Sequence, residues 1–202
     1  MSVAYWEERA RRYGPRAAIN LDHPEGSLAR VSAAHEALLL PLLSARLGGD
    51  ERAVLDLGCG PGRMTAALAA RVAGGRAIGA DPTAAMLALA PSAPGVQYRL
   101  IGEDGRLPLA DGEVDVVFTC LVLGGILDPG ALARSADEVR RVLAPGGLVL
   151  LAESVSDQPP EIHWAPRSAA DYRTAFAWAA LEAVAHFDDG GDPVVVLVGR
   201  RP

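Results

Sequence analysis

One stretch constrains this chain more than any other: "AVLDLGCGPGRMT", which runs from residue 53 to residue 65. An apolar run contains Asp56, and glycines follow at positions 58, 60 and 62. Glycine lets the backbone adopt positive φ, and it lets a ligand approach where a Cβ atom would clash. The helix expected next would point its free N–H groups at the same place. The stretch therefore predicts a ligand over the carboxyl end of a buried strand, at the switch point of an α/β sheet.

Short apolar runs alternate with helical patterns along the rest of the chain, which is typical of an α/β fold with a mainly parallel sheet. We expect a Rossmann-like, seven-stranded, mostly parallel sheet with helices on both faces and an antiparallel C-terminal hairpin. The strands are expected at residues 53–57, 76–80, 96–101, 114–119, 148–153, 181–188 and 194–200. The helices are expected at residues 3–13, 27–47, 62–73, 83–90, 129–143 and 168–180. Three prolines in residues 154–167 exclude one regular element there.

The chain has 202 residues, which suits one domain. Its expected parts are N-terminal helices roofing the site (1–47), a cofactor-binding core (50–152), a substrate lid and helix (154–180) and a hairpin (181–202). Half of the residues are hydrophobic, and no apolar run reaches the roughly 20 residues that a membrane helix needs. We see no secretory signal and expect a cytoplasmic protein, monomeric or homodimeric. The net charge of −6 and the lack of a basic stripe argue against nucleic acid as a partner.

Several cofactors are disfavoured by the residues around the glycines. The chain has no lysine, so it has neither a P-loop nor a lysine Schiff base. The dinucleotide fingerprint needs a small residue at position 63, which is Arg63 here, and the Asp56 carboxylate would repel a pyrophosphate. Such a carboxylate suits a cofactor that carries an ammonium and a sulfonium, and this favours S-adenosylmethionine over NAD. No His/Cys cluster indicates a metal.

Four segments in order resemble class I S-adenosylmethionine-dependent methyltransferases, in the small-molecule, type 11-like branch that includes quinone methyltransferases. These segments are "VLDLGCGPGRMTAALA", "GADPTAAML", "GEDGRLPLADGEVDVVFT" and "VLAPGGLVLL". The resemblance covers about residues 50 to 152. It implies S-adenosylmethionine as cofactor and S-adenosylhomocysteine as product.

The resemblance also implies roles for individual residues. The glycine loop would comprise Asp56, Gly58, Gly60 and Gly62. Asp81 would hold the ribose, while Pro82 and Met86 would border the adenine. The remaining cofactor contacts would come from Glu103 and Asp104 near the adenine amino group, Thr119 and Cys120 near the methionine, and Tyr13 closing over it. Gly124 and Gly125 stand where the family often has a polar pair. Nothing basic flanks Cys120 in the sequence, so we interpret it as a packing residue rather than a nucleophile.

Methyl transfer from a sulfonium is an in-line displacement, so the protein mainly holds the acceptor in place and excludes water. A general base is needed only if the acceptor carries a proton of high pKa. The acceptor site is expected between residues 1–35 and 154–172. His163 and His23 are the candidate bases, with Asp171 a further one and Trp164 and Tyr172 as pocket walls. We expect a methyltransferase acting at O, N or C of a small metabolite. The alternatives are a protein that binds the cofactor without methylating, and a nicotinamide-dependent oxidoreductase, which Arg63 and Asp56 disfavour.

Overall fold

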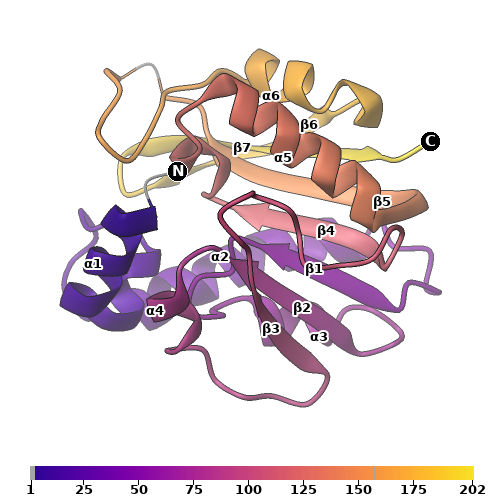
Figure 1. Ribbon diagram of the computed structural model, residues 1–202, viewed down its shortest axis with the longest axis horizontal. Helices are drawn as coiled ribbons and strands as arrows, with labels where there is room; N and C mark the ends of the chain where they lie inside the picture. The colour runs from indigo at the N-terminus through magenta and orange to yellow at the C-terminus, as the bar shows by residue number, and fades with distance from the viewer. Residues whose placement is uncertain (1–2, 157) are drawn as a thin grey trace.

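The protein was analysed as a computed structural model that describes residues 3–156 and 158–202. A seven-stranded sheet with the order β3-β2-β1-β4-β5-β7-β6 forms its centre (Figure 1). The strands are β1 (Ala53–Leu57), β2 (Arg76–Asp81), β3 (Val96–Leu100), β4 (Val114–Cys120), β5 (Leu143–Ser154), β6 (Glu182–Asp189) and β7 (Asp192–Arg200). Strands β1 to β5 pair in parallel, whereas β7 runs antiparallel to both β5 and β6. The prediction of a mostly parallel sheet with an antiparallel C-terminal hairpin is therefore confirmed.

Helices cover both faces of the sheet because side chains of each central strand alternate between two apolar clusters. Leu55, Val117 and Val149 face one cluster, which includes residues of α5 (Pro129–Val142) and α6 (Ala169–Ala175). Their sequence neighbours Val54, Val116 and Leu150 belong to the other cluster, with residues of α2 (Leu28–Ser44) and α3 (Thr65–Ala69). Each central strand is thus buried on both sides.

The expected helices differ from the observed ones mainly at their ends. The helix expected at 62–73 is α3, Thr65–Ala69, which starts later because Gly62 has a φ of +74°, outside the helical region. The helix expected at 168–180 is divided into α6 and the 3₁₀ turn η3 (Ala177–Ala179), since Phe176 leaves helical geometry at φ −104°, ψ 37°. Strand β5 begins at Leu143 rather than residue 148, because Leu143 already pairs with Val114.

The N-terminal part lies beside the carboxyl edge of the sheet (Figure 1). Helix α1 (Val3–Tyr13) is followed by the 3₁₀ turn η1 (Gly14–Ala18), and α1 lies next to α4 (Ala84–Leu87), the short helix after β2. The loop after β4 contains a third 3₁₀ turn, η2 (Leu123–Gly125). Among the described residues, no helix combines the length and apolar character needed to cross a bilayer.

Candidate functional site

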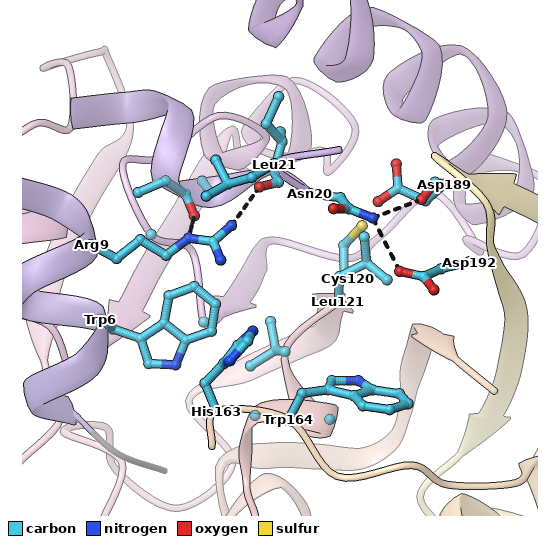
Figure 2. Close-up of a pocket in the computed structure, with 18 of the residues that line it drawn as sticks. Trp6, Arg9, Asn20, Leu21, Cys120, Leu121, His163, Trp164, Asp189 and Asp192 are labelled. Atoms are coloured by element: carbon cyan, nitrogen blue, oxygen red, sulfur yellow. Dashed lines mark hydrogen bonds between the residues drawn. The ribbon is translucent and has the colours of Figure 1, made fainter. Parts of the chain in front are cut away.

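Two cavities lie beside the loops that follow the carboxyl ends of the parallel strands. The first has a volume of about 490 Å³ and lies between the glycine loop, the N-terminal segment, Ser156 with residues 158–164, and the turn that joins β6 to β7 (Figure 2). The second has a volume of about 550 Å³ and lies between the loops after β2 and β3 and helix α5. Gly58 and Val122 line both cavities, so the two cavities lie on either side of these residues. This is the position at which open α/β sheets bind ligands.

The glycine loop has the left-handed backbone that its sequence requires. Gly58, Gly60 and Gly62 have φ values of +69°, +53° and +74°. A Cβ atom on Gly58 would collide with the methyl groups of Val122, and one on Gly62 would collide with the hydroxyl of Tyr98. Only glycine lets β1 turn into α3 with these neighbours so close.

The two predicted carboxylates hold this loop in different ways. Asp81 accepts hydrogen bonds from the backbone N–H of Gly60 (2.9 Å) and of Thr83 (2.8 Å), and it lines the first cavity. Asp56 instead accepts a hydrogen bond from the hydroxyl of Thr65 at 2.6 Å and is not among the described residues that line either cavity. Burial raises the pKa of both carboxyl groups, that of Asp56 to about 6.

The structure brings most of the predicted residues to the two cavities. Those that line the first are Gly58, Gly60, Asp81, Met86, Cys120 and His163, and those that line the second are Gly58, Pro82, Glu103 and Asp104. Asp104 also accepts a hydrogen bond from the backbone N–H of Arg106 within its turn. The other five are absent from the described linings: Gly62 packs on Tyr98, Thr119 is fully buried, and Tyr13, Asp56 and His23 lie elsewhere.

Tyr13 and the candidates on α6 are placed differently from the expectation. Tyr13 lies at the end of α1, 36% exposed, with the guanidinium of Arg12 over its ring. Asp171 completes a capping box with Ser168 at the start of α6. Tyr172 is fully buried, and its hydroxyl donates to the carbonyl oxygen of Ser154. The aromatic residues of α1 that line the first cavity are Tyr5 and Trp6.

His163 lies in an aromatic wall of the first cavity (Figure 2). Its ring stacks on Tyr5 with a centroid distance of 4.3 Å and meets Trp6 edge-on at 5.9 Å. Burial lowers the pKa of His163, although Glu161, with Oε2 at 3.5 Å from Nδ1, acts in the other direction. The imidazole is therefore uncharged at neutral pH and can accept a proton.

The glycine at position 124 makes room for the neighbouring tryptophan. A Cβ atom on Gly124 would lie 2.6 Å from Nε1 of Trp164, so the indole rests against the bare backbone. The N–H of Ala165 also donates to the carbonyl oxygen of Gly124, which docks residues 161–165 on the loop after β4. An aromatic side chain from residues 161–165 thus lies where the family often has a polar side chain.

Cys120 has basic neighbours in space, although none flanks it in the sequence. Nη2 of Arg63 donates to Sγ of Cys120 at 3.3 Å, and Nδ1 of His35 lies 4.0 Å from the same sulfur. Arg63 belongs to the glycine loop and His35 to α2, so only the fold brings them together. Arg63 thus projects toward Cys120 and lines the first cavity.

His23 belongs to a cluster with His35 and Asp189 and is not among the described residues that line either cavity. Nε2 of His23 and Nε2 of His35 lie 2.9 Å and 3.1 Å from the same oxygen of Asp189, the last residue of β6. Burial is the largest single effect on His35 and lowers its pKa, but the contacts with Asp189 and Cys120 together outweigh burial and raise the pKa to about 9. The neighbouring Arg63 guanidinium opposes that rise. The cluster ties the N-terminal segment and α2 to the C-terminal hairpin.

Asn20 strengthens the same connection (Figure 2). Its side-chain amide donates to the carbonyl oxygen of Asp189 at 3.3 Å and to the carboxylate of Asp192 at 3.1 Å. Asn20, Asp189 and Asp192 all line the first cavity. Sequence reasoning missed these three residues because partners 169 and 172 positions apart carry no shared local pattern.

Sequence reasoning also missed Glu153, which ends the apolar run "LVLLAE". Its carboxylate is 1% exposed and accepts hydrogen bonds from the Thr119 hydroxyl (2.5 Å) and from the backbone N–H groups of Val122 and Leu123. A glutamate at the end of a strand buried on both faces was the available signal. Among the described residues, no group of three or more histidine, cysteine or acidic side chains is arranged to hold a metal ion.

Comparison with known proteins identifies a methyltransferase domain in this chain. Residues 54–147 match the family model described as a methyltransferase domain. The malonyl-[acyl-carrier protein] O-methyltransferase of Pseudescherichia vulneris is 36% identical over 125 residues, which cover 61% of this chain and 48% of that protein. The chain spans less than half the length of the first curated relatives that it matches.

Solved structures share the fold. The DhpI–SAH complex has a TM-score of 0.68 at 21% identity, and the match covers 99% of this chain and 95% of the other. Geranyl diphosphate C-methyltransferase from Streptomyces coelicolor A3(2) has a TM-score of 0.67 at 17% identity, and the match covers 99% of this chain and 96% of the other. At these identities the likeness speaks for the fold. Together with the matched family model and the glycine loop, it shows that residues 54–147 form a methyltransferase domain of the class I, S-adenosylmethionine-dependent type.

Proposed function

We propose that this protein transfers a methyl group from S-adenosylmethionine to an O, N or C atom of a small-molecule metabolite. The observation that carries the proposal is the pair of adjacent cavities that share Gly58 and Val122 as lining residues. A nucleoside cofactor needs room on both sides of the glycine loop, and the acceptor needs room beside its methyl group. The first cavity has aromatic and polar walls beyond the glycine loop, and this supports a separate acceptor position there.

The residues present fit the cofactor. Asp81 lines the first cavity and would accept from ribose hydroxyls, and Pro82 with Glu103 and Asp104 would surround the adenine in the second cavity. The raised pKa values of Asp56 and Asp81 indicate negative charge that the surrounding protein does not fully compensate. A ligand with an ammonium and a sulfonium group would supply the missing positive charge. When bound, S-adenosylmethionine supplies a methyl group on an activated leaving group.

The chain's own residues would then hold the acceptor and exclude water. Trp6, His163 and Trp164 come from two segments and line one cavity (Figure 2), which suits a small organic acceptor held between rings. His163 would take the proton of an acceptor that carries one, because its uncharged imidazole lines that cavity. The formal charge of −6 supports an acceptor other than nucleic acid.

A mass spectrum of the small molecules released from the denatured purified protein tests the cofactor, and S-adenosylmethionine or S-adenosylhomocysteine is the expected result. Incubation with S-adenosylmethionine and fractionated metabolite pools then tests transfer, with S-adenosylhomocysteine formation as the readout. Binding without turnover in any pool would favour the alternative, a protein that binds the cofactor without methylating. If neither compound is released and neither binds on addition, the proposal fails.

A further inference from the structure

The segment after β4 separates the two cavities. Val122 and Gly58 line both cavities, and the Val122 methyl groups occupy the space that a Gly58 Cβ atom would need. Leu121, directly before, has a φ of +61°, which costs a non-glycine residue of order 1 kcal/mol or more. Such a backbone persists only where the surroundings hold it. The position of Val122 is therefore imposed by neighbouring contacts.

Glu153 supplies the contacts at the start of this segment. Its Oε2 atom accepts from the N–H of Val122 at 3.1 Å and from the N–H of Leu123 at 3.0 Å, while Oε1 accepts from the Thr119 hydroxyl. A carboxylate that accepts several donors in a buried site forms strong, well-directed hydrogen bonds. Glu153 thus joins the ends of β4 and β5 to the turn that carries Val122.

Arg167 holds the other end of the segment. Its guanidinium donates to the carbonyl oxygen of Leu123 at 2.8 Å and to that of Ile126. Arg167 as a whole is 8% exposed. The turn is therefore bound through its N–H groups by a buried anion and through its carbonyl groups by a buried cation. Burying two charged side chains costs desolvation free energy, which is repaid only if their hydrogen bonds to the turn are well directed. These hydrogen bonds therefore hold the turn in one position.

We propose that Glu153 is a positioning residue that fixes Val122 over Gly58 and so sets the passage between the two cavities that a bound nucleoside would cross. This inference rests on the proposed function for the identity of the nucleoside. The hydrogen bonds from the N–H groups of Val122 and Leu123 to Glu153 support the placement of Val122 whichever ligand binds.

A pH dependence follows from the chemistry of the carboxyl group. Burial raises the pKa of Glu153 to about 7, although the Thr119 hydroxyl and the N–H groups of Val122 and Leu123 act in the other direction. Among the described ionisable groups, Tyr172 on α6 interacts with the Glu153 carboxylate, and Arg167 binds the carbonyl oxygen of Leu123 on the same turn. Protonation converts one acceptor oxygen into a donor, which cannot accept from an N–H group. The turn is therefore held fully above pH 7 and less firmly below it.

The test compares S-adenosylhomocysteine binding by calorimetry at pH 6, 7 and 8 in the wild type, Glu153→Gln and a control. If only the ionised form binds, a group that titrates at about 7 makes the wild-type dissociation constant about tenfold larger at pH 6 than at pH 8. Glu153→Gln should bind at least about tenfold more weakly than the wild type at pH 8, without this pH dependence. Asp115→Asn is the matched control, because Asp115 accepts from the N–H groups of Arg52 and Ala53 on the same sheet, away from the cavities. The control should retain the wild-type affinity and pH profile.

Hydrogen exchange in the ligand-free protein separates this inference from the proposed function. A peptide covering residues 119–126 should lose protection in Glu153→Gln, and in the wild type between pH 8 and pH 6 after correction for intrinsic rates, but not in Asp115→Asn. If the wild type binds no S-adenosylhomocysteine, the proposed function fails while the exchange result still decides the role of Glu153. Unchanged protection in both comparisons would overturn the inference, as would Glu153→Gln binding with the wild-type affinity and pH profile.

Discussion

At the scale of single residues, Asp81 is the clearest link between the fold and cofactor binding. Both of its oxygens already accept from backbone N–H groups, of Gly60 and Thr83, so its orientation toward the first cavity is fixed. Asp81→Ala should weaken S-adenosylhomocysteine binding by about 1–3 kcal/mol, because hydrogen bonds to ribose are lost. Calorimetry measures this, with Glu182→Gln on the exposed edge of β6 as the control. Unchanged affinity in Asp81→Ala would mean that the cofactor binds elsewhere.

His163 provides a second test at this scale. Burial lowers its pKa, so the wild-type imidazole is already in the proton-accepting form at pH 7, and turnover should be flat above that pH and fall as the medium becomes more acidic. His163→Gln should reduce S-adenosylhomocysteine formation by about 10²-fold or more while leaving cofactor affinity nearly unchanged. His186→Gln on β6 is the control, because His186 is exposed and is not among the described residues lining either cavity. A His163→Gln variant that turns over at the wild-type rate would remove this residue as the base.

At the scale of elements, residues 19–22, which line the first cavity, are held by contacts with a segment far away in the chain. Asn20 connects the N-terminal segment to the turn between β6 and β7 through Asp189 and Asp192. Asn20→Ala should raise hydrogen exchange in residues 19–22 and lower the free energy of unfolding by about 1 kcal/mol. Arg11→Ala, which removes an exposed ion pair with Glu7 on α1, should leave this exchange unchanged. Equal exchange in the wild type and Asn20→Ala would show that other contacts hold residues 19–22 in place.

The elements also show what the sequence could predict. The buried strands β1, β4 and β7 were predictable, since each contains a short apolar run. The glycine loop was predictable because its backbone needs positive φ at positions 58, 60 and 62, where glycine is favoured. The cluster around Asp189 was not, because His23, His35 and Asn20 meet only when the hairpin and the N-terminal segment fold together. Helix ends were missed where a single backbone angle decided them, as at Phe176. Local patterns thus predict the strands and the glycine loop better than they predict contacts between distant segments.

At the scale of the whole molecule, the carboxyl edge of the sheet concentrates buried acids. Asp56, Asp81 and Glu153 stand at or near the ends of β1, β2 and β5, all are at most 7% exposed, and burial raises the pKa of each. Ionising such groups in the folded state is unfavourable without a cation nearby. The protein therefore gives up stability at neutral pH in the region where the cationic cofactor is proposed to bind.

Asp56 allows this cost to be measured through its pH dependence. Its pKa is 3.8 in the unfolded chain and about 6 in the folded protein, so the unfolded chain loses the proton at lower pH. The contribution of Asp56 to the free energy of unfolding should therefore fall as pH rises from about 4 to about 6, by an amount on the order of 3 kcal/mol. Asp56→Asn removes the charge and keeps an oxygen for the Thr65 hydroxyl, so it should unfold at a higher temperature than the wild type at pH 8, with the difference disappearing near pH 4.

Asp171→Asn is the control and should unfold at a lower temperature than the wild type at pH 8. The N–H and hydroxyl of Ser168 lower the pKa of Asp171, so its contribution to stability is present above pH 4 and lost in acid. Calorimetric melting of the three proteins from pH 4 to pH 8 gives the comparison, and a lower melting temperature for Asp56→Asn at pH 8 would show that the ionised carboxylate stabilises the loop.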